Sequence, residues 1–159
     1  MLLADVNSTA YEIVLSLHII AVVIGFGGVA LAGITARVAL QHQGAAGGAV
    51  AEAGAKLVAL AEYAIYLVPI LGIGLVSMSG HAFGFGDPWI SASFTLYVIA
   101  LAIALAVIRP AMKRFAVAVA DEGQAVEAEK LHKTLSIAGG VVNLIWVVVV
   151  FLMVLKPGA

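Results

Sequence analysis

Cysteine is absent from the 159 residues, and charged side chains make up only 11% of them. The lack of cysteine excludes disulfides, thiolate metal ligands and cysteine nucleophiles. The formal net charge of −1 shows no excess of basic residues, so we expect no nucleic acid partner. Hydrophobic residues reach 64%, more than a soluble domain of this size can bury. The composition therefore predicts a membrane protein whose main partner is the lipid bilayer.

Four apolar runs are each long enough to cross a hydrocarbon core of about 30 Å: residues 13–40, 57–77, 90–108 and 134–155. The third run is ended or bent at Arg109-Pro110, because proline breaks the hydrogen-bond ladder of a helix. No linker is long enough to divide domains, so we expect residues 1–159 to form one transmembrane domain. Short connections favour antiparallel neighbours, which predicts an all-α, four-helix, up-down transmembrane bundle.

The distribution of basic residues predicts the orientation. Seven of the eight lie in or beside the first and third connections, and only Lys156 lies on the other side. Because basic flanks stay in the cytoplasm, we expect both termini and the loop at residues 80–89 to face outward. The enrichment in alanine, glycine and valine is typical of a GC-rich bacterial genome. We therefore expect a multi-pass protein of the bacterial cytoplasmic (inner) membrane.

His18 is the most informative single residue. It lies about 8 Å inside the first run at 1.5 Å per residue. A polar group at this depth should face the bundle rather than lipid. The imidazole could ligate haem or a metal, or it could pack and hydrogen-bond to a neighbouring helix. A stripe of small residues continues along its helix face and permits close approach by a helix or a flat ligand: Ala21, Gly25, Gly28, Ala32 and Ala36.

His81 is a candidate second ligand for a haem iron. It follows the second run and lies on the same predicted side of the membrane as His18. Two histidines from adjacent helices could supply both axial ligands. The alternative is an exposed loop histidine beside glycines.

Glu62 and Asn143 are polar side chains inside the second and fourth runs. A carboxylate within a span is a functional candidate, for proton transfer or substrate contact. Glu62 is also shallow enough for a structural ion pair with a nearby basic residue: Arg37, Lys56 or Lys133. Asn143 most simply forms an interhelical hydrogen bond.

Two segments resemble known membrane proteins. Residues 11–37, YEIVLSLHIIAVVIGFGGVALAGITAR, resemble the first helix of small four-helix bacterial membrane proteins. They show an aromatic residue, then Leu-His, an apolar stretch, a Gly-Gly pair and a closing arginine. The ending VVVVFLMVLKPG, residues 147–158, is similar to the C-terminus of domain-of-unknown-function family 2269, a family of predicted integral membrane proteins.

Two related groups share the Leu-His helix, the copper-resistance D-like family and the membrane protoporphyrinogen oxidase family. In the oxidase family the histidine of the first helix is linked to haem, and His18 stands at the matching position. The resemblance therefore implies the four-helix fold and haem b as the candidate cofactor. Because family 2269 has no assigned activity, the resemblance implies no reaction, and whether the chain is an enzyme stays open.

Three functions remain after these observations. The first is an accessory or self-associating membrane subunit without catalysis, in a homo-oligomer or a larger complex, with its glycine faces as packing surfaces. The second is a haem-binding redox protein that uses His18. The third is a proton-coupled small carrier with Glu62 and Asn143 beside its path. An absorption spectrum of the purified protein, oxidised and reduced, separates the second from the others.

The orientation gives a direct test, because the sequence has no native cysteine. Cysteines placed at Gly84 and Gly158 should react in intact cells with a reagent that cannot cross membranes. A cysteine at Gly123 should react only after the membrane is opened. Labelling at Gly123 in intact cells would reverse the predicted orientation.

Overall fold

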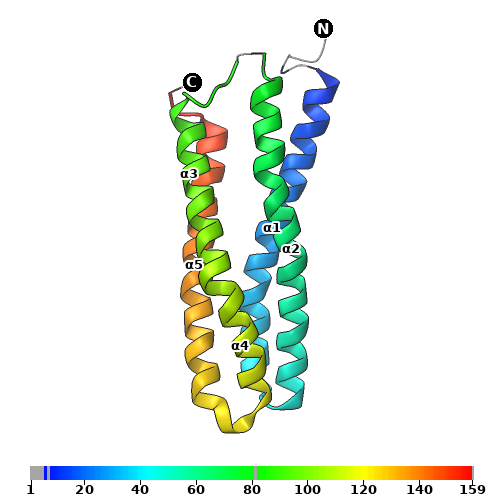
Figure 1. Cartoon of the computed structure of the whole chain (residues 1–159), viewed down its shortest axis with the longest axis vertical. Coiled ribbons are helices and arrows are strands. Elements are labelled where there is room, and N and C mark those ends of the chain that lie inside the picture. The colour runs from blue at the N-terminus through cyan, green and yellow to red at the C-terminus, as the bar shows by residue number, and fades with distance from the viewer. Residues whose placement is uncertain (1–5, 7, 81, 159) are drawn as a thin grey trace.

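The computed structural model describes residue 6 and residues 8–80 and 82–158, and it confirms an all-α bundle without β-strands in that part of the chain (Figure 1). The chain passes along the length of the bundle four times, so the start of α1 and the end of α5 lie at the same end of the bundle. The elements are α1 Thr9–Gln41, α2 Ala45–Met78, α3 Pro88–Ile103, the π-helix η1 Ala104–Ile108, α4 Arg109–Ala120, the 3₁₀ turn η2 Glu122–Gln124 and α5 Ala125–Leu155.

Four helical stretches in the described residues are long and apolar enough to cross a membrane: Thr9–Gln41, Ala45–Met78, Pro88–Ala120 and Glu122–Leu155. Each has more than the roughly 20 residues that a span needs, so the helices continue past the bilayer core. The sequence suggested a connection from Gln41 to Lys56, but α2 already begins at Ala45. Alanine is the best helix former, and the Ala-rich start of α2 therefore continues the helix.

The turn between α1 and α2 and the turn between α4 and α5 are short and contact each other. The Asp121 carboxylate accepts hydrogen bonds from the Gly123 N–H at 3.0 Å and the Gln124 side chain at 2.9 Å. These bonds, led by that of Gln124, lower the pKa of Asp121 below its usual value. Gly44, with φ of +83°, donates its N–H to the Val119 carbonyl at 2.9 Å and so joins the first turn to the end of α4.

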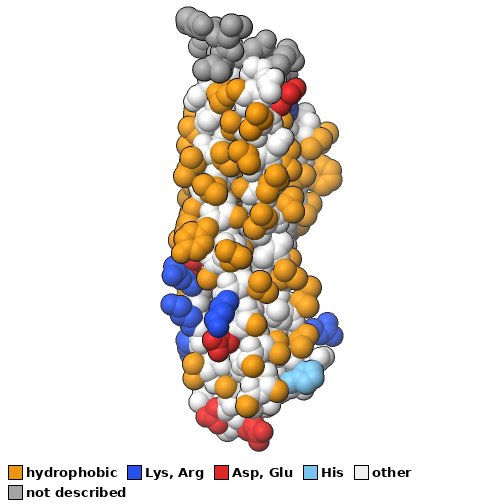
Figure 2. All heavy atoms as spheres, turned by 90° about the vertical axis from the view of Figure 1, so that its right-hand side faces the viewer, with side chains coloured by type: hydrophobic (Ala, Val, Ile, Leu, Met, Phe, Trp, Pro, Cys, Tyr) orange, Lys and Arg blue, Asp and Glu red, His pale blue; other side chains and the backbone are white. Residues whose placement is uncertain are grey.

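Charge divides the bundle along its length. We call the half with the start of α1 and the end of α5 the terminal half, and the opposite half, with most Lys and Arg, the basic half. Figure 2 shows that on one face hydrophobic side chains cover the terminal half, whereas charged side chains gather over the basic half. Large apolar side chains face outward, including Val23, which is 65% exposed, and Leu144, also 65% exposed. Lipid is the solvent that suits such a surface.

The small-residue stripe of α1 packs against α2 of the same chain. All of its predicted members are buried, from His18 to Ala36. A Cβ atom built on Gly25 would lie 2.8 Å from Cγ1 of Ile65, and one built on Gly28 would collide with Cβ of Ala61. Gly25 and Gly28 therefore bring two helices of one chain together, which occupies the surface that a second copy would need.

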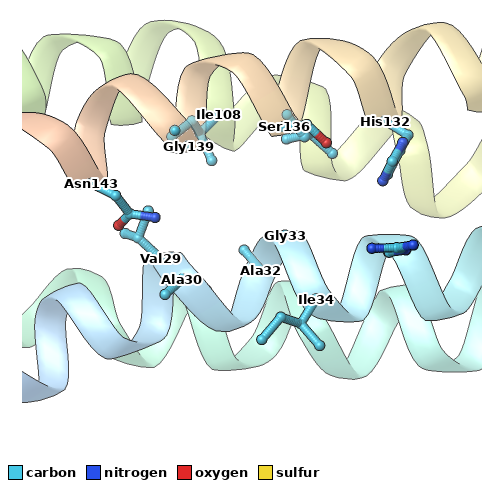
Figure 3. A pocket seen from close by; sticks show the side chains of 13 residues that line it. Val29, Ala30, Ala32, Gly33, Ile34, Ile108, His132, Ser136, Gly139 and Asn143 are labelled. Atoms are coloured by element: carbon cyan, nitrogen blue, oxygen red, sulfur yellow. The ribbon is translucent and has the colours of Figure 1, made fainter.

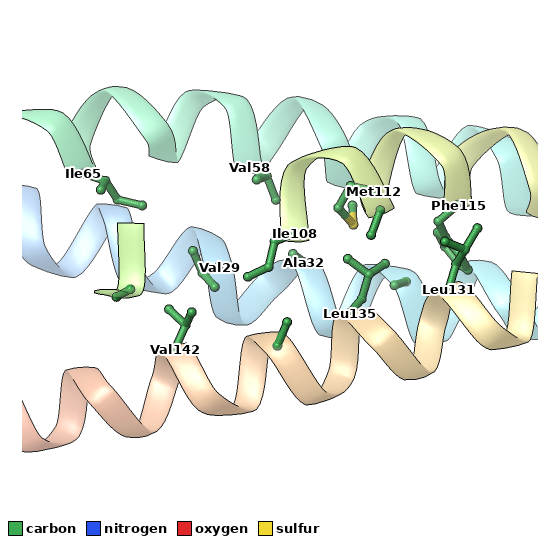
Figure 4. Close-up of a cluster of buried hydrophobic side chains, with 14 of the residues drawn as sticks. Val29, Ala32, Val58, Ile65, Ile108, Met112, Phe115, Leu131, Leu135 and Val142 are labelled. Atoms are coloured by element: carbon green, nitrogen blue, oxygen red, sulfur yellow. The ribbon is translucent and has the colours of Figure 1, made fainter. Parts of the chain in front are cut away.

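Larger side chains fill the basic half. Phe115 of α4 is fully buried, and it belongs to one cluster of buried side chains with Ile108, Met112, Leu131 and Leu135 (Figure 4). These side chains pack α4 and α5 against the α1–α2 pair, so the basic half has a hydrophobic core between its helices.

The third long helix bends at Pro110. Proline has no N–H to donate to the carbonyl four residues earlier, and its ring crowds that carbonyl. The chain responds with the π-helix η1, in which the Arg109 N–H bonds to the Ala104 carbonyl, five residues back. Beyond the bend α4 leans toward α2, whereas α3 packs on α5 (Figure 1). The two halves of the bundle consequently differ in which helices pack together.

The α1–α2 contact predicts a difference between adjacent glycines. Gly28→Leu should destabilise the protein by about 1–3 kcal/mol, because overpacking forces the helices apart. Gly27→Leu is the matched control, since a Cβ on Gly27 meets nothing within 4 Å. Thermal unfolding of both variants in detergent measures the difference. Equal stability of the two variants would show that the close contact at Gly28 does not contribute to the stability of the protein.

Candidate ligand pocket in the terminal half

A cavity of about 540 Å³ lies in the terminal half, and side chains of all four long helices line it. We call it the terminal pocket. Its volume is in the range of small-molecule sites, and its walls are mainly apolar and aromatic, as in such sites. Its lining includes side chains with polar groups, among them His18, Trp89, Ser93, Tyr97, Trp146 and Lys156.

His18 enters the pocket from α1. Its side chain is buried, with 6% exposure. Gly72 of α2 lies directly against the ring, where an added Cβ would be only 3.3 Å from Cε1 of the imidazole. The absence of a side chain at Gly72 therefore makes room for the histidine between the two helices.

The floor of the pocket is built around a carbonyl that Pro69 leaves without its helical partner. Pro69 lies within α2 and has no N–H for the carbonyl of Ile65, four residues earlier. The hydroxyl of Tyr97 on α3 donates to this carbonyl at 3.2 Å, in a buried position. Trp146 of α5 lies beside Tyr97, with ring centroids 6.1 Å apart, and stacks on Phe26 of α1. This central layer of Phe26, Ile65, Tyr97 and Trp146 closes the pocket from below.

A single basic residue, Lys156, lies among the residues that line the pocket. Its ammonium nitrogen is 4.4 Å from the Phe83 ring centroid and 5.9 Å from that of Trp89, which are cation–π distances. Lys156 follows the last residue of α5 and adopts a left-handed conformation with φ of 45°. The end of α5 thus places a positive charge beside the aromatic rim of the pocket.

Four buried polar atoms in the described residues have no hydrogen-bond partner, and all four belong to side chains that line this pocket: His18 Nδ1, Trp89 Nε1, Ser93 Oγ and Trp146 Nε1. Buried groups of this kind are rare, and each costs about 1–3 kcal/mol. Their convergence on one cavity marks it as the candidate site. The sequence singled out His18 as a site residue, but not Trp89, Ser93, Tyr97 or Trp146.

Glu62 forms an ion pair, but its partner differs from the three that the sequence suggested. Oε2 of Glu62 lies 3.7 Å from Nη1 of Arg109, and the Glu62 side chain is 17% exposed. Lys56 pairs instead with Glu52 at 2.9 Å. The bend at Pro110 is the reason, because it brings the start of α4 beside α2 at this level. Glu62 lines neither this pocket nor the second cavity described below.

The other predicted site residues lie elsewhere. Arg37 and Asn143 line the second cavity, in the basic half, and are not near His18. His81 lies outside the described residues. Within the described part of the chain, no three His, Asp or Glu side chains come close enough to hold a metal ion together. A metal at His18 would thus need a ligand from outside that part or from a bound group.

Over residues 12–157 the sequence matches the family described as "Predicted integral membrane protein (DUF2269)". The chain belongs to this family. No curated protein and no solved structure matches it. Membership and the four apolar helices together make it a multi-pass integral membrane protein. The family description names no activity, so function has to be argued from the site itself.

The floor of the pocket yields a coupled prediction. Tyr97→Phe should cost about 0.6–1.7 kcal/mol, the measured range for hydrogen bonds between membrane helices. In a Pro69→Ala background the cost should shrink, because the new N–H satisfies the Ile65 carbonyl within α2. Unfolding free energies of the two single variants and the double variant measure this coupling. An identical cost of Tyr97→Phe in both backgrounds would contradict the assigned role of Pro69.

Proposed function

We propose that this membrane protein binds a lipid-soluble small molecule that carries hydrogen-bond acceptors, and that it does so in the terminal pocket. The observation that carries the proposal is the gathering of four unpartnered buried polar atoms around one cavity of about 540 Å³. A ligand that bonded to them would remove a cost that the ligand-free protein bears.

The unpartnered atoms limit the chemistry of the ligand. The indole N–H groups of Trp89 and Trp146 can only donate, so their partners are acceptors such as carbonyl oxygens. Ser93 and the imidazole of His18 can donate or accept. The remaining walls are apolar and aromatic, which suits a flat ring or a hydrocarbon body. A ring with carbonyl oxygens, as in a quinone, has this combination of features.

Haem b is the second candidate ligand, and one specific feature supports it. His18 Nδ1 has no partner in the protein and can act as one axial ligand. Lys156 could pair with an acidic group of the macrocycle at the aromatic rim. When bound, haem would supply a redox-active iron. The role of the protein residues would be to hold it and to exclude water.

Intrinsic fluorescence tests the proposal without labels, because both tryptophans of the chain line the pocket. A short-chain benzoquinone, titrated into the purified protein in detergent, should quench the emission saturably. Haem, titrated separately, should give a sharpened and shifted Soret band, relative to haem in detergent alone, only if it is the ligand. Ser93→Ala should weaken benzoquinone binding. Ser77→Ala is the control, because the Ser77 hydroxyl bonds within α2 and lies outside the pocket.

His18 gives the sharpest prediction, since binding and stability should change in opposite directions. His18→Phe replaces a ring whose Nδ1 has no hydrogen-bond partner by an apolar ring of similar size. The ligand-free protein should become more stable, by up to about 1–3 kcal/mol, and binding should be lost. His42→Phe is the control, because His42 is exposed and lines neither cavity. Loss of stability in His18→Phe would mean that the imidazole has a structural partner, and would count against the proposed site.

A further inference from the structure

A second cavity, of about 430 Å³, lies between α1 and α5 in the basic half (Figure 3). We call it the basic-half groove. Val29 to Arg37 of α1 form one wall and His132 to Asn143 of α5 form the other. Ile108 also lines it. The groove is separate from the terminal pocket, because the stacked rings of Phe26 and Trp146 lie between them.

Three glycines leave the groove wide. A Cβ atom built on Gly33, Gly139 or Gly140 would meet nothing within 4 Å. Along α1 the groove extends about 12 Å, the rise of the eight residues from Val29 to Arg37 at 1.5 Å each. Its rim includes Ile34, which is 60% exposed on the apolar outer surface. The groove thus has the dimensions and the lining of a trough for a hydrocarbon chain.

The polar groups of the groove are distributed unevenly. α1 and α5 are antiparallel and meet at Phe26 and Trp146, so Arg37 and His132 share the far end. In the described part of the chain no carboxylate forms an ion pair with Arg37. Figure 3 shows His132 and Asn143 of α5 pointing toward α1, with Asn143 facing Val29 at the deep end. A positive charge without a partner therefore lies at the mouth of an otherwise uncharged groove.

We propose that the basic-half groove binds one anionic phospholipid. The phosphate group contacts Arg37 and His132, and the hydroxyl of Ser136 lies close enough along α5 to add a further bond. One acyl chain lies along Gly33, Gly139 and Gly140 toward Asn143. Basic pockets between membrane helices bind anionic headgroups in this manner. A soluble anion fits less well, because a single guanidinium faces it and the groove is mainly apolar.

Native mass spectrometry of the purified protein in detergent measures the binding. Phosphatidylglycerol should bind more tightly than phosphatidylcholine with the same chains, and inorganic phosphate should not bind. Arg37→Gln should weaken phosphatidylglycerol binding about fivefold, which corresponds to about 1 kcal/mol for one basic residue near a headgroup. Lys113→Gln, which removes the same charge from an exposed position outside the groove, should leave binding unchanged.

A second pair of variants tests the acyl chain. Gly33→Leu fills the groove and should reduce lipid binding, whereas Gly27→Leu, on the same helix and outside the groove, should not. Neither added Cβ meets a neighbour within 4 Å, so both variants should fold. Equal losses in Arg37→Gln and Lys113→Gln would indicate diffuse surface attraction and overturn the site. Binding of inorganic phosphate alone, equal affinity for phosphatidylcholine, or full lipid binding by Gly33→Leu would overturn it as well.

Discussion

The missing N–H of Pro110 is the constraint on which much of this structure depends. It interrupts the hydrogen-bond ladder of the third long helix, and the chain inserts a π-helix to compensate. The resulting bend brings α4 against α2 and pairs Glu62 with Arg109. It leaves α3 beside α5, with the terminal pocket between α3 and α2. The packing of α4 on α2 in the basic half and the terminal pocket in the other half are thus two results of one interruption of the backbone hydrogen bonds.

The unpartnered atoms of the terminal pocket differ from the other polar groups of the helices. Hydroxyls such as those of Ser16 and Ser77 bond to a carbonyl one turn earlier on their own helix, at 2.8 and 2.9 Å. Such back-bonding is always available to serine in a helix. Ser93 does not use it, and neither does Nδ1 of His18, although the His42 imidazole does bond in this way to the Val38 carbonyl, at 3.0 Å. Their lack of partners is therefore a feature of this cavity rather than of membrane helices in general.

Sequence patterns predicted the helices well because apolar length and spacing are local properties. They also predicted the burial of the stripe from His18 to Ala36, because a polar residue and small residues on one face stand out in an apolar run. The partner of Glu62 was wrong because it depends on a bend whose direction the sequence does not encode locally. Trp89, Ser93 and Tyr97 were not predicted as site residues because these residue types are ordinary near a membrane interface. Their spacing of four residues puts them on one face of α3, but only the packing of α3 against the other helices makes that face a wall of the pocket.

The α1–α2 and α3–α5 pairs are in close contact at the central layer, and a cavity lies between them on each side of it. Small residues hold α1 to α2, α3 packs on α5, and α4 contacts both α2 and α5. Between the pairs, the central layer joins them through the stack of Phe26 on Trp146 and the bond from Tyr97 to Ile65. The terminal pocket lies on one side of this layer and the basic-half groove on the other. Any molecule that fills either cavity contacts both pairs and binds only the assembled bundle, so its binding free energy adds to the stability of the fold. Ligand binding at either cavity is therefore thermodynamically linked to assembly of the helices.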